Sequence, residues 1–352
     1  MTKKILIIGQ GISGTLLSWY LYKAGIPFVV IDNNAAHTAS KVAAGIINPV
    51  TGRRIVKTWM IDELIPFAVN AYTEIGDFFN QTFLTKNSIV DFFATEQMAT
   101  AFADRLMENA DYLAMQNDTD YNPTFNYNFG YGYIQPTYTI AVQSIVANWR
   151  NYLQQQHLLI TTEYSEALLK VTDCEIMYDT ITASHIVYAN GEQCSSNNYF
   201  KNLPFAPNKG EALLIECNEL PTNLIFKKGL TIAPIGTNLY WVGANYIWNY
   251  EDALPTQSFY NDTNLWLQQF VKVPYTIVEH KAAIRPANLE RRPFVGFHPT
   301  YNNVGILNGM GAKGTSLAPY FANQLVQYIT HQQPILAEAD VLRFSKILQK
   351  TF

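Results

Sequence analysis

The sequence has few cysteines, few charged residues and no long uninterrupted apolar run. Its three cysteines, Cys174, Cys194 and Cys217, form no C-x-x-C pair and have no histidine beside them at metal-ligand spacing. Neither a disulfide framework nor a zinc site is therefore indicated. The six histidines are scattered and form no H-E-x-x-H pair, the pattern typical of zinc metalloproteases. We expect no metal site.

The charge balance and the distribution of apolar residues exclude two further classes. Charged residues make up 15% of the chain, the net charge is −4, and no basic block occurs, whereas a general nucleic-acid binder carries the opposite sign. No apolar stretch is long enough to span a bilayer. Glycines interrupt the N-terminal run Ile5–Ile8 too early for a secretory signal. The sequence predicts a soluble cytoplasmic protein.

What the chain does contain is enough apolar material for a substantial core. Of its 352 residues, 48% are apolar and 14% aromatic, which fits one large domain or two interleaved domains. Periodicity predicts a strand, a helix and a strand at 5–8, 13–24 and 28–31. It then predicts helices at 58–79 and 139–155, short strands over 158–189, a β-rich stretch over 211–278, a strand at 304–307 and a helix at 315–330. No linker separates these parts, so we expect discontinuous domains.

The segment Gly9 to Gly14 reads G-x-G-x-x-G, directly after the first predicted strand and before the first predicted helix. In a dinucleotide site these glycines allow a tight turn, a close approach of the backbone to a pyrophosphate and close helix–strand packing. Asp32 ends the second strand, where an acid can bind a ribose hydroxyl. Asn33 and Asn34 follow it in place of an arginine, which disfavours NADP. The three elements together predict a dinucleotide site.

A second G-x-G-x-x-G stands at Gly309 to Gly314, too close to the C-terminus for another strand-helix-strand unit. Its backbone N–H groups and the following helix can face a partial negative charge, such as that of a reduced flavin. Ala43 to Pro49 supplies small residues that can lie along a planar ring, although an ordinary turn has the same composition. The first glycine fingerprint and Asp32 do not separate FAD from NAD, and the small-residue segment by itself does not either.

In chain order, these segments resemble the FAD-dependent D-amino-acid oxidase, glycine oxidase and sarcosine oxidase family. Besides the glycine fingerprint with Asp32, the similar segments are 43–47, 132–153 with its G-x-x-x-P turn before a helix, 185–191, 209–211, 284–286, 293–296 and 309–319. The resemblance implies an α/β fold, with a Rossmann-like FAD-binding domain and a smaller substrate domain on a mainly antiparallel sheet. It implies the boundaries 1–80, 136–204 and 286–352 for the FAD-binding domain and 81–135 and 205–285 for the substrate domain.

The resemblance also implies which residues contact FAD. These are Gly9, Gly11, Ile12, Ser13, Gly14, Asp32, Asn33, Ala43, Ala44, Gly45, Ile46, Ala189, Asn190, Gly191, Arg285, Gly309, Gly311, Ala312, Lys313 and Gly314. Relatives that hold the flavin covalently use a cysteine near the segment here numbered 284–286, and none lies there. We therefore expect noncovalent FAD.

Three residues are catalytic candidates. Arg285 can hold a substrate carboxylate through two parallel hydrogen bonds, although pairing with Glu290 is its structural alternative. Lys313 can assist the carboxylate or lie near the flavin C2 carbonyl. Tyr246 can line the substrate cavity, with core packing as the alternative. The strand at 239–243 lacks the lysine that relatives associate with oxygen, so another electron acceptor is an open option.

The implied activity is oxidation of the C–N bond of a small amino acid or secondary amine by hydride transfer to flavin N5. One alternative is an oxidase of a carboxymethylaminomethyl-type tRNA uridine, for which Arg53, Arg54 and Lys57 would offer a basic patch. A noncatalytic FAD-binding protein and an NAD-dependent dehydrogenase are the others. We expect a small-molecule partner and no nucleic acid, and the oligomeric state stays open.

Overall fold

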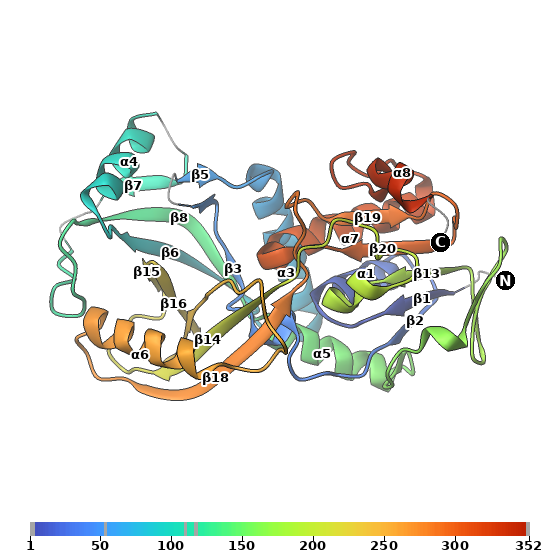
Figure 1. Cartoon of the computed structure of the whole chain (residues 1–352), viewed down its shortest axis with the longest axis horizontal. Coiled ribbons are helices and arrows are strands. Elements are labelled where there is room, and N and C mark those ends of the chain that lie inside the picture. Colours follow the sequence, from blue (N-terminus) through green and yellow to red (C-terminus); the bar gives the residue numbers. More distant parts are fainter. Residues whose placement is uncertain (1–3, 53–54, 109–110, 116–118, 350–352) are drawn as a thin grey trace. The chain divides into compact units, whose positions relative to one another are not determined.

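The structure is a computed structural model that describes residues 4–52, 55–108, 111–115 and 119–349. Its internal contacts divide the chain into two compact units, coloured along the sequence in Figure 1. Unit 1 comprises Met1–Lys41, Val142–Asn208 and Ile284–Phe352, and unit 2 comprises Val42–Ala141 and Lys209–Ala283. Both units are discontinuous in sequence.

Unit 1 is built on a six-stranded sheet in the order β19-β20-β13-β1-β2-β9. The strands are β1 (Ile5–Ile8), β2 (Phe28–Ile31), β9 (Leu159–Ile160), β13 (His185–Tyr188), β19 (Phe294–Phe297) and β20 (Val304–Asn308). All neighbours are parallel except β19 and β20. The main helices are α1 (Ile12–Lys23), α5 (Val142–Gln155) and α7 (Gly314–His331). This parallel order is the predicted Rossmann-like architecture.

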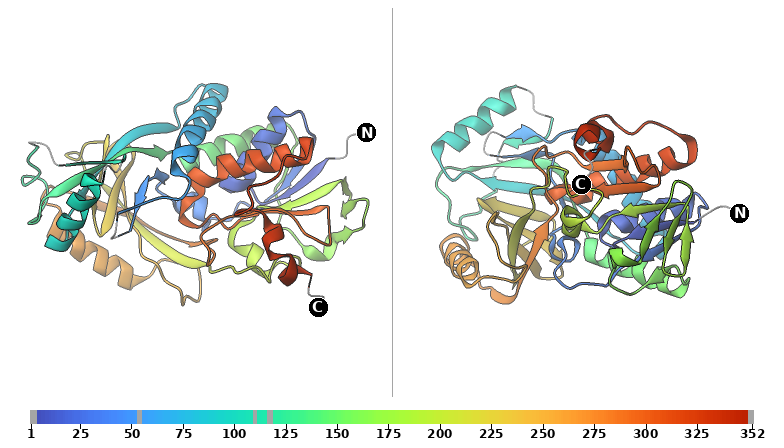
Figure 2. Two further views of the ribbon diagram at one scale, coloured as in Figure 1. Left: turned by 90° about the horizontal axis from the view of Figure 1, so that it is seen from above. Right: turned by 45° about the vertical axis from the view of Figure 1, so that its right-hand side comes forward.

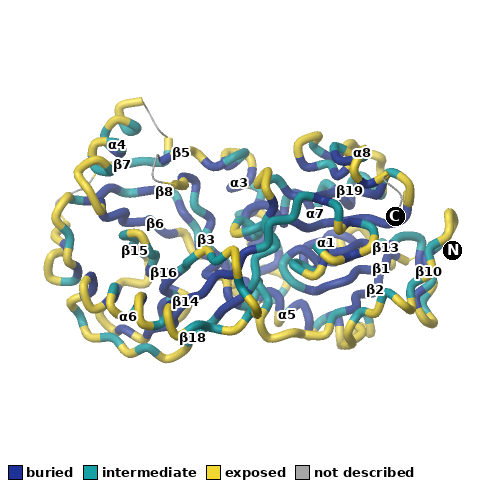
Figure 3. Tube along the Cα trace, in the orientation of Figure 1, coloured by how far each residue is buried: buried dark blue, intermediate teal, exposed yellow. Residues whose placement is uncertain are grey.

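Every residue of β1 and β2 is buried, because helices and loops cover both faces of a parallel sheet. On one face α1 packs against α5 and α7, and these helices lie side by side in Figure 2. On the other face, Leu6, Ile8, Ile186 and Phe200 belong to one apolar cluster. Around it lie α8 (Ser345–Leu348) and a small antiparallel sheet of β10 (Leu169–Val171), β11 (Ile176–Tyr178) and β12 (Ile181–Ala183). Figure 3 shows the central strands buried along their length.

Unit 2 contains a nine-stranded sheet with the path β18-β14-β17-β16-β15-β6-β8-β3, and β7 pairs with β8. The strands are β3 (Ile46–Ile47), β6 (Leu84–Phe92), β7 (Leu113–Met115), β8 (Tyr131–Ile140), β14 (Asn208–Glu216), β15 (Leu224–Lys228), β16 (Leu230–Gly236), β17 (Leu239–Gly243) and β18 (Thr276–Arg285). The helices are α3 (Ile61–Phe79), α4 (Glu96–Met107) and α6 (Gln257–Phe270). A hairpin of β4 (Val50–Thr51) and β5 (Val56–Lys57) completes it. The sheet is mainly antiparallel, as predicted, with β15 and β6 parallel.

Alternate residues of the unit 2 sheet point to opposite faces, as pleating requires. Val90 and Phe92 of β6 join the apolar cluster that contains Phe259 and Leu267 of α6. Ile89, directly before Val90, joins a separate cluster with Phe102 of α4. The sheet is therefore covered on both faces.

Residues 42–80 group with unit 2, although the domain boundaries implied by the family resemblance assigned them to the FAD-binding domain. The cause is local: β3 pairs with β8, and α3 packs beside β6. The two units consequently have similar lengths. Which residues of each serve FAD or substrate stays a prediction.

Two local expectations were wrong. The segment 132–140 was expected to be a turn and the start of a helix, but it belongs to β8, and α5 begins at Val142. Pro136 is accommodated there because the pairing of β8 with β6 shifts register between Asn87 and Ile89, next to the proline. The β-rich stretch 211–278 is interrupted by α6, whose N-cap Thr256 accepts a hydrogen bond from Phe259 N.

Candidate functional site

The glycine turn between β1 and α1 has the geometry of a dinucleotide-binding loop. Gly9 has a φ of 97°, and a Cβ there would lie 2.6 Å from the Cα of Asn190. A Cβ on Gly14 would lie 1.9 Å from the carbonyl oxygen of Gly9. Chain packing therefore requires these two glycines. Around Gly11 the nearest contact of an added Cβ is the Ser40 hydroxyl at 3.1 Å, so no backbone atom blocks the approach of a ligand.

The start of α1 supplies a positive end. Gly11 is the N-cap and provides no side-chain cap, and the first turn has no acidic residue. Ile12 N donates to Ser40 Oγ at 2.9 Å, and Ser13 is buried. A helix N-terminus of this kind attracts phosphate groups.

Asp32 follows β2, and its carboxylate is 19% exposed. Oδ2 accepts a hydrogen bond from Gln10 N at 2.9 Å, which ties the acid to the glycine turn. Oδ1 accepts from Asn34 N at 2.8 Å. The exposed Asn33 accepts from Ala35 N, as in a tight turn. The acid is thus fixed beside the turn, as a ribose-binding residue must be.

The sequence analysis missed Arg150, which lies on α5 far from Asp32 in sequence. Its guanidinium is only 8% exposed and lies 2.6 Å from Asp32 Oδ1. Since the residue sits on a helix face with ordinary amphipathic spacing, nothing local marks it. Only the packing of α5 beside α1 brings the two charges together.

The second glycine loop lies next to the first within unit 1. A Cβ on Gly314 would be 3.2 Å from Ile12 Cγ2, and α7 packs along α1. Gly309 and Gly311 have φ angles of 75° and 56°, and Gly311–Lys313 forms a short 3₁₀ turn in which Ala312 is exposed. The structure therefore brings together two loops that are 300 residues apart in the sequence.

Two asparagines hold the second glycine loop in place, and the sequence analysis missed both. Asn308 donates to Gly191 O at 2.9 Å and accepts from Gly309 N at 2.8 Å. Asn288 donates to Gly309 O at 2.8 Å. Asn308 is 2% exposed, so the hydrogen bonds that join the second glycine loop to the segment after β13 are sheltered from water.

The residues after β13 supply an acceptor suited to a ligand. Ala189 N donates to Ile8 O at 2.8 Å, which places this segment against the glycine turn. Asn190 Oδ1 is a buried acceptor with no hydrogen-bond partner among the described residues. Buried polar atoms are normally paired. The unpaired acceptor Asn190 Oδ1 and the fixed carboxylate of Asp32 fit the donor groups of the adenosine of FAD. The glycine turn and the positive end of α1 fit its pyrophosphate.

Arg285 ends β18 and is half-buried. Its Nη1 donates to Asn208 Oδ1 at 2.9 Å, so an amide helps to orient the guanidinium. Glu290, the acid considered above as its ion-pair partner, lies 3.1 Å from Arg343 Nε. A guanidinium can bind a carboxylate through two parallel hydrogen bonds. Its role in binding a substrate stays a prediction.

Lys313 immediately precedes α7 and is half-buried. Burial lowers the pKa of its ammonium group, and the neighbouring charges of Arg291 and Arg292 lower it further. These three residues make the second loop electropositive, which favours an anionic ligand nearby.

Tyr246 is 61% exposed on the loop after β17, so the alternative of core packing was wrong. The loop is anchored by Glu211, a fully buried acid that the sequence analysis did not single out. Glu211 accepts from Thr256 N at 2.6 Å and from Asn245 Nδ2 at 3.4 Å. His280 Nε2 lies 3.1 Å from the same carboxylate. One carboxylate therefore holds both ends of the loop that carries Tyr246.

The small-residue segment Ala43 to Ile46 belongs to unit 2. Ala43 is exposed and Ala44 is buried, while Ile46 pairs with Thr139 of β8. A Cβ on Gly45 would lie 1.9 Å from the carbonyl oxygen of Ile140. Strand pairing alone thus explains the glycine, and a contact of this segment with a flavin stays a prediction.

Other features add no competing site. Arg53 and Arg54 lie outside the described residues, and Lys57 forms ion pairs with Asp62 at 2.7 Å and with Asp111 at 3.2 Å. The described residues include no group of acids, histidines and cysteines suited to a metal. None of their helices combines the length and apolar character needed to cross a bilayer.

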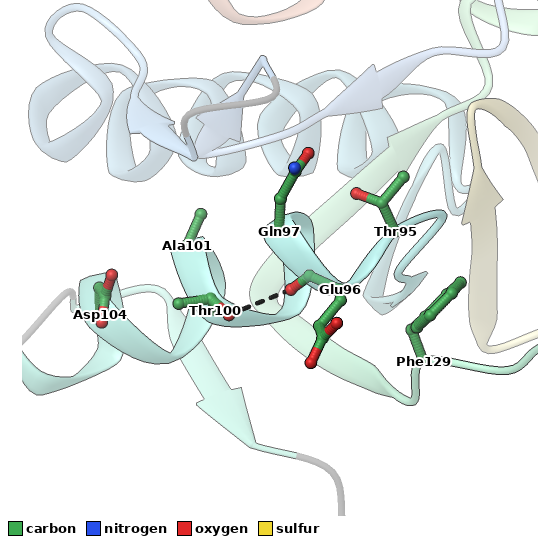
Figure 4. A pocket seen from close by; sticks show the side chains of 7 residues that line it. All are labelled: Thr95, Glu96, Gln97, Thr100, Ala101, Asp104 and Phe129. Carbon is green, nitrogen blue, oxygen red and sulfur yellow. Dashed lines mark hydrogen bonds between the residues drawn. The ribbon is translucent and has the colours of Figure 1, made fainter.

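The cysteines and a surface hollow on unit 2 are also uninformative about catalysis. All three cysteines are free, and burial raises the pKa of the Cys194 thiol. Figure 4 shows a surface hollow of about 610 Å³. Its lining residues are Thr95, Glu96, Gln97, Thr100, Ala101, Asp104 and Phe129. It offers no nucleophile paired with a base.

Comparisons with known proteins agree with this geometry. Glycine oxidase from Pseudomonas putida is 22% identical over 363 residues, covering 96% of this chain and 98% of that protein. A shorter match of 52 residues, 44% identical to p-hydroxybenzoate hydroxylase from Acinetobacter baylyi, covers only 14% of this chain and 13% of that protein.

Two solved structures share the fold across their lengths. Iminodiacetate oxidase from Chelativorans sp. BNC1 has a TM-score of 0.77 and 16% identity, covering 96% and 98% of the two chains. L-proline dehydrogenase from P. horikoshii has a TM-score of 0.78 and 14% identity, covering 98% of both. The model of the family named FAD dependent oxidoreductase matches residues 4–328. With the glycine turn, Asp32 and the paired loops in place, this match establishes that the chain belongs to the FAD dependent oxidoreductase family.

Proposed function

We propose that this FAD-dependent oxidoreductase oxidises the C–N bond of a small amino acid or secondary amine. The observation that carries the proposal is Arg285, a half-buried guanidinium held by Asn208 beside the segment that leads to the second glycine loop. A cation so placed suits the carboxylate of an amino acid. Similarity to a glycine oxidase, an iminodiacetate oxidase and a proline dehydrogenase supports the same substrate class.

FAD would be held noncovalently by the residues predicted above. The α1 N-terminus and Gly11 would bind the pyrophosphate, Asp32 a ribose hydroxyl, and Asn190 Oδ1 a donor of the cofactor. When bound, FAD supplies a hydride acceptor at N5. The electropositive second loop with Lys313 would stabilise negative charge that develops on the ring.

Arg285 would contribute by orientation. Two hydrogen bonds to the substrate carboxylate fix the α-carbon, and the amide of Asn208 restrains the guanidinium against rotation. Positioning of this kind is how protein side chains contribute when the cofactor carries the chemistry. Tyr246, on the loop anchored by Glu211, would offer an exposed aromatic face to a substrate.

The first experiment is the visible spectrum of the purified protein, followed by anaerobic addition of glycine, sarcosine, proline and D-amino acids. Bleaching by one compound would establish amine oxidation and identify the substrate class. A flavin spectrum that none of them changes would contradict the proposal and favour a noncatalytic FAD protein. Acid precipitation should leave all flavin in the supernatant, since the attachment is noncovalent. Molecular oxygen and an artificial redox dye can then be compared as electron acceptors for the reduced flavin.

Arg285→Ala tests the carboxylate contact, with Arg105→Ala as the matched control because Arg105 is an exposed arginine paired with Glu108 on α4. The Arg285 variant should raise KM about 100-fold or more while FAD stays bound. Unchanged KM would remove Arg285 from the substrate site.

The tRNA alternative loses support because Lys57 is engaged by two acids, and salt-sensitive tRNA binding would restore it.

A further inference from the structure

The guanidinium of Arg150 makes hydrogen bonds with several elements of unit 1. Nη1 donates to Asp32 Oδ1 at 2.6 Å and to Gln10 Oε1 at 3.2 Å. Nη2 donates to Asp32 O at 3.3 Å and to Thr161 Oγ1 at 3.2 Å. One side chain of α5 thereby joins the glycine turn, the end of β2 and the end of β9.

Gln10 extends this network into the glycine turn. Its Nε2 donates to Thr15 Oγ1 at 2.9 Å and to Val146 O at 3.0 Å. Its backbone N donates to Asp32 Oδ2. Gln10 and Arg150 are 3% and 7% exposed. Hydrogen bonds in such a sheltered place hold their geometry more firmly than exposed ones.

The network does not use the full hydrogen-bond acceptor capacity of the Asp32 carboxylate. A carboxylate accepts about four hydrogen bonds. Asp32 Oδ1 accepts from Asn34 N and Arg150, and Oδ2 accepts from Gln10 N. Room therefore remains for about one further donor, on Oδ2.

We propose that Arg150 is a positioning residue for FAD, which orients Asp32 so that Oδ2 accepts a single hydroxyl of the adenosine ribose. Arg150 acts through Asp32 and Gln10 and does not itself contact the reacting atoms. A carboxylate without this guanidinium can rotate and spread its hydrogen bonds over both oxygens. The inference rests on the proposed role of Asp32 as the ribose acceptor.

The test measures the dissociation constant of the apoprotein for FAD and for two FAD analogues, which lack the 2′ or the 3′ hydroxyl of the adenosine ribose. Quenching of flavin fluorescence gives the binding curves. The native protein should bind one analogue about 10- to 100-fold more weakly than FAD. The ratio of the two dissociation constants, that of this analogue over that of FAD, measures the preference for the missing hydroxyl. In Arg150→Met this ratio should fall towards one. A merely structural loosening would weaken FAD and both analogues equally and leave the ratio unchanged.

Three further variants separate the possible failures. Arg150→Lys keeps the charge but loses the planar fork, so it should lower the ratio even if Arg150→Met does not fold. Arg343→Met removes another half-buried arginine of unit 1, one that pairs with Glu290, and should leave the ratio as in the native protein. Asp32→Asn should abolish the preference altogether.

The outcomes are distinct. If Asp32→Asn keeps the full ratio, the ribose assignment of Asp32 itself fails. If Asp32→Asn abolishes the ratio while Arg150→Met and Arg150→Lys retain it, only the inference about Arg150 is overturned. If Arg150→Met and Asp32→Asn have effects that multiply in the double variant, the two residues act independently and the inference is again overturned.

Discussion

The two G-x-G-x-x-G loops of unit 1 have the same spacing but differ in what requires their glycines. In the first, Gly11 has an ordinary φ of −73°, and an added Cβ on Gly14 would lie 1.9 Å from a backbone carbonyl oxygen. In the second, Gly311 has a φ of 56°, and the nearest atom to an added Cβ on Gly314 is a side-chain methyl at 3.2 Å. Gly9 and Gly309, which open the two loops, both have a positive φ, of 97° and 75°. At the later positions close packing constrains the first loop at Gly14, and backbone conformation constrains the second at Gly311.

This difference teaches that an identical motif can arise from different physical demands. The first loop passes under a helix that must pack tightly on β1, and it is followed by an acid that the turn helps to hold. The second loop is held mainly by asparagine side chains, Asn308 and Asn288. Substitutions at matched positions should therefore have unequal effects.

The largest contrast is expected between Gly14→Ala and Gly314→Ala. The first change forces a methyl group into the Gly9 carbonyl and should destabilise the fold by more than about 4 kcal/mol. The second places a methyl against the flexible Ile12 side chain, at a helical position where alanine is favoured, so its effect should stay within about 1 kcal/mol. Urea unfolding followed by circular dichroism measures both. Equal losses would contradict the distinction.

Acid should weaken the strand pair that leads into the second loop. His298 follows β19 and accepts hydrogen bonds at Nδ1 from Thr300 N and Tyr301 N. Burial lowers its pKa from 6.5 to about 4. The unfolded chain thus binds a proton more readily, and the stability due to neutral His298 is complete above about pH 6.5 and is lost as the pH falls towards 4.

The expected loss approaches roughly 3 kcal/mol across that range. Unfolding free energies at about pH 7 and about pH 4.5 should show it in the native protein. His298→Gln, which cannot titrate, should show a shallower dependence while all carboxylates contribute as before. A parallel dependence in both proteins would mean that His298 does not titrate in this range.

Asn308→Ala should loosen the second loop. It removes the bond to Gly191 O and the acceptor for Gly309 N, both in a buried place. The expected cost is about 1–3 kcal/mol, together with weaker retention of FAD on gel filtration. Asn70→Ala, on the exposed face of α3, is the matched control and should change neither. If FAD retention stays native, the link between the loops is not needed for the cofactor.

The smallest stability contrast is between Gly311→Ala and Gly11→Ala. An alanine at Gly311 must adopt the left-handed region at a cost of about 1–2 kcal/mol. At Gly11 the backbone is compatible with alanine, so the fold should keep its stability while FAD binds more weakly. Thermal unfolding of the apoprotein and FAD titration measure the two quantities separately. Native FAD affinity in Gly11→Ala would show that the pyrophosphate does not approach this residue.

Much of unit 1 could be predicted because its signals are local. Ile5–Ile8, the glycine turn, the first helix and Asp32 lie within one strand-helix-strand segment, and their spacing alone specifies a known arrangement. The likeness of 132–136 to a G-x-x-x-P turn misled the prediction, since this segment is part of β8 and a register shift in the pairing with β6 accommodates Pro136. The helix Gln257–Phe270 was missed within a β-rich stretch, although Thr256 marks its start.

The sequence by itself determined the class of fold, the dinucleotide turn and the acid that follows it, because these depend on residues close together in the chain. It also determined the resemblance to a flavoprotein family, because that rests on short segments and their order along the chain. Only the tertiary structure decided that Arg150 pairs with Asp32, that Asn308 joins two distant loops, and that Glu211 anchors the loop of Tyr246. Each of these contacts is formed by side chains brought together from separate elements. Periodicity specifies which face of an element is buried, but not which partner it meets.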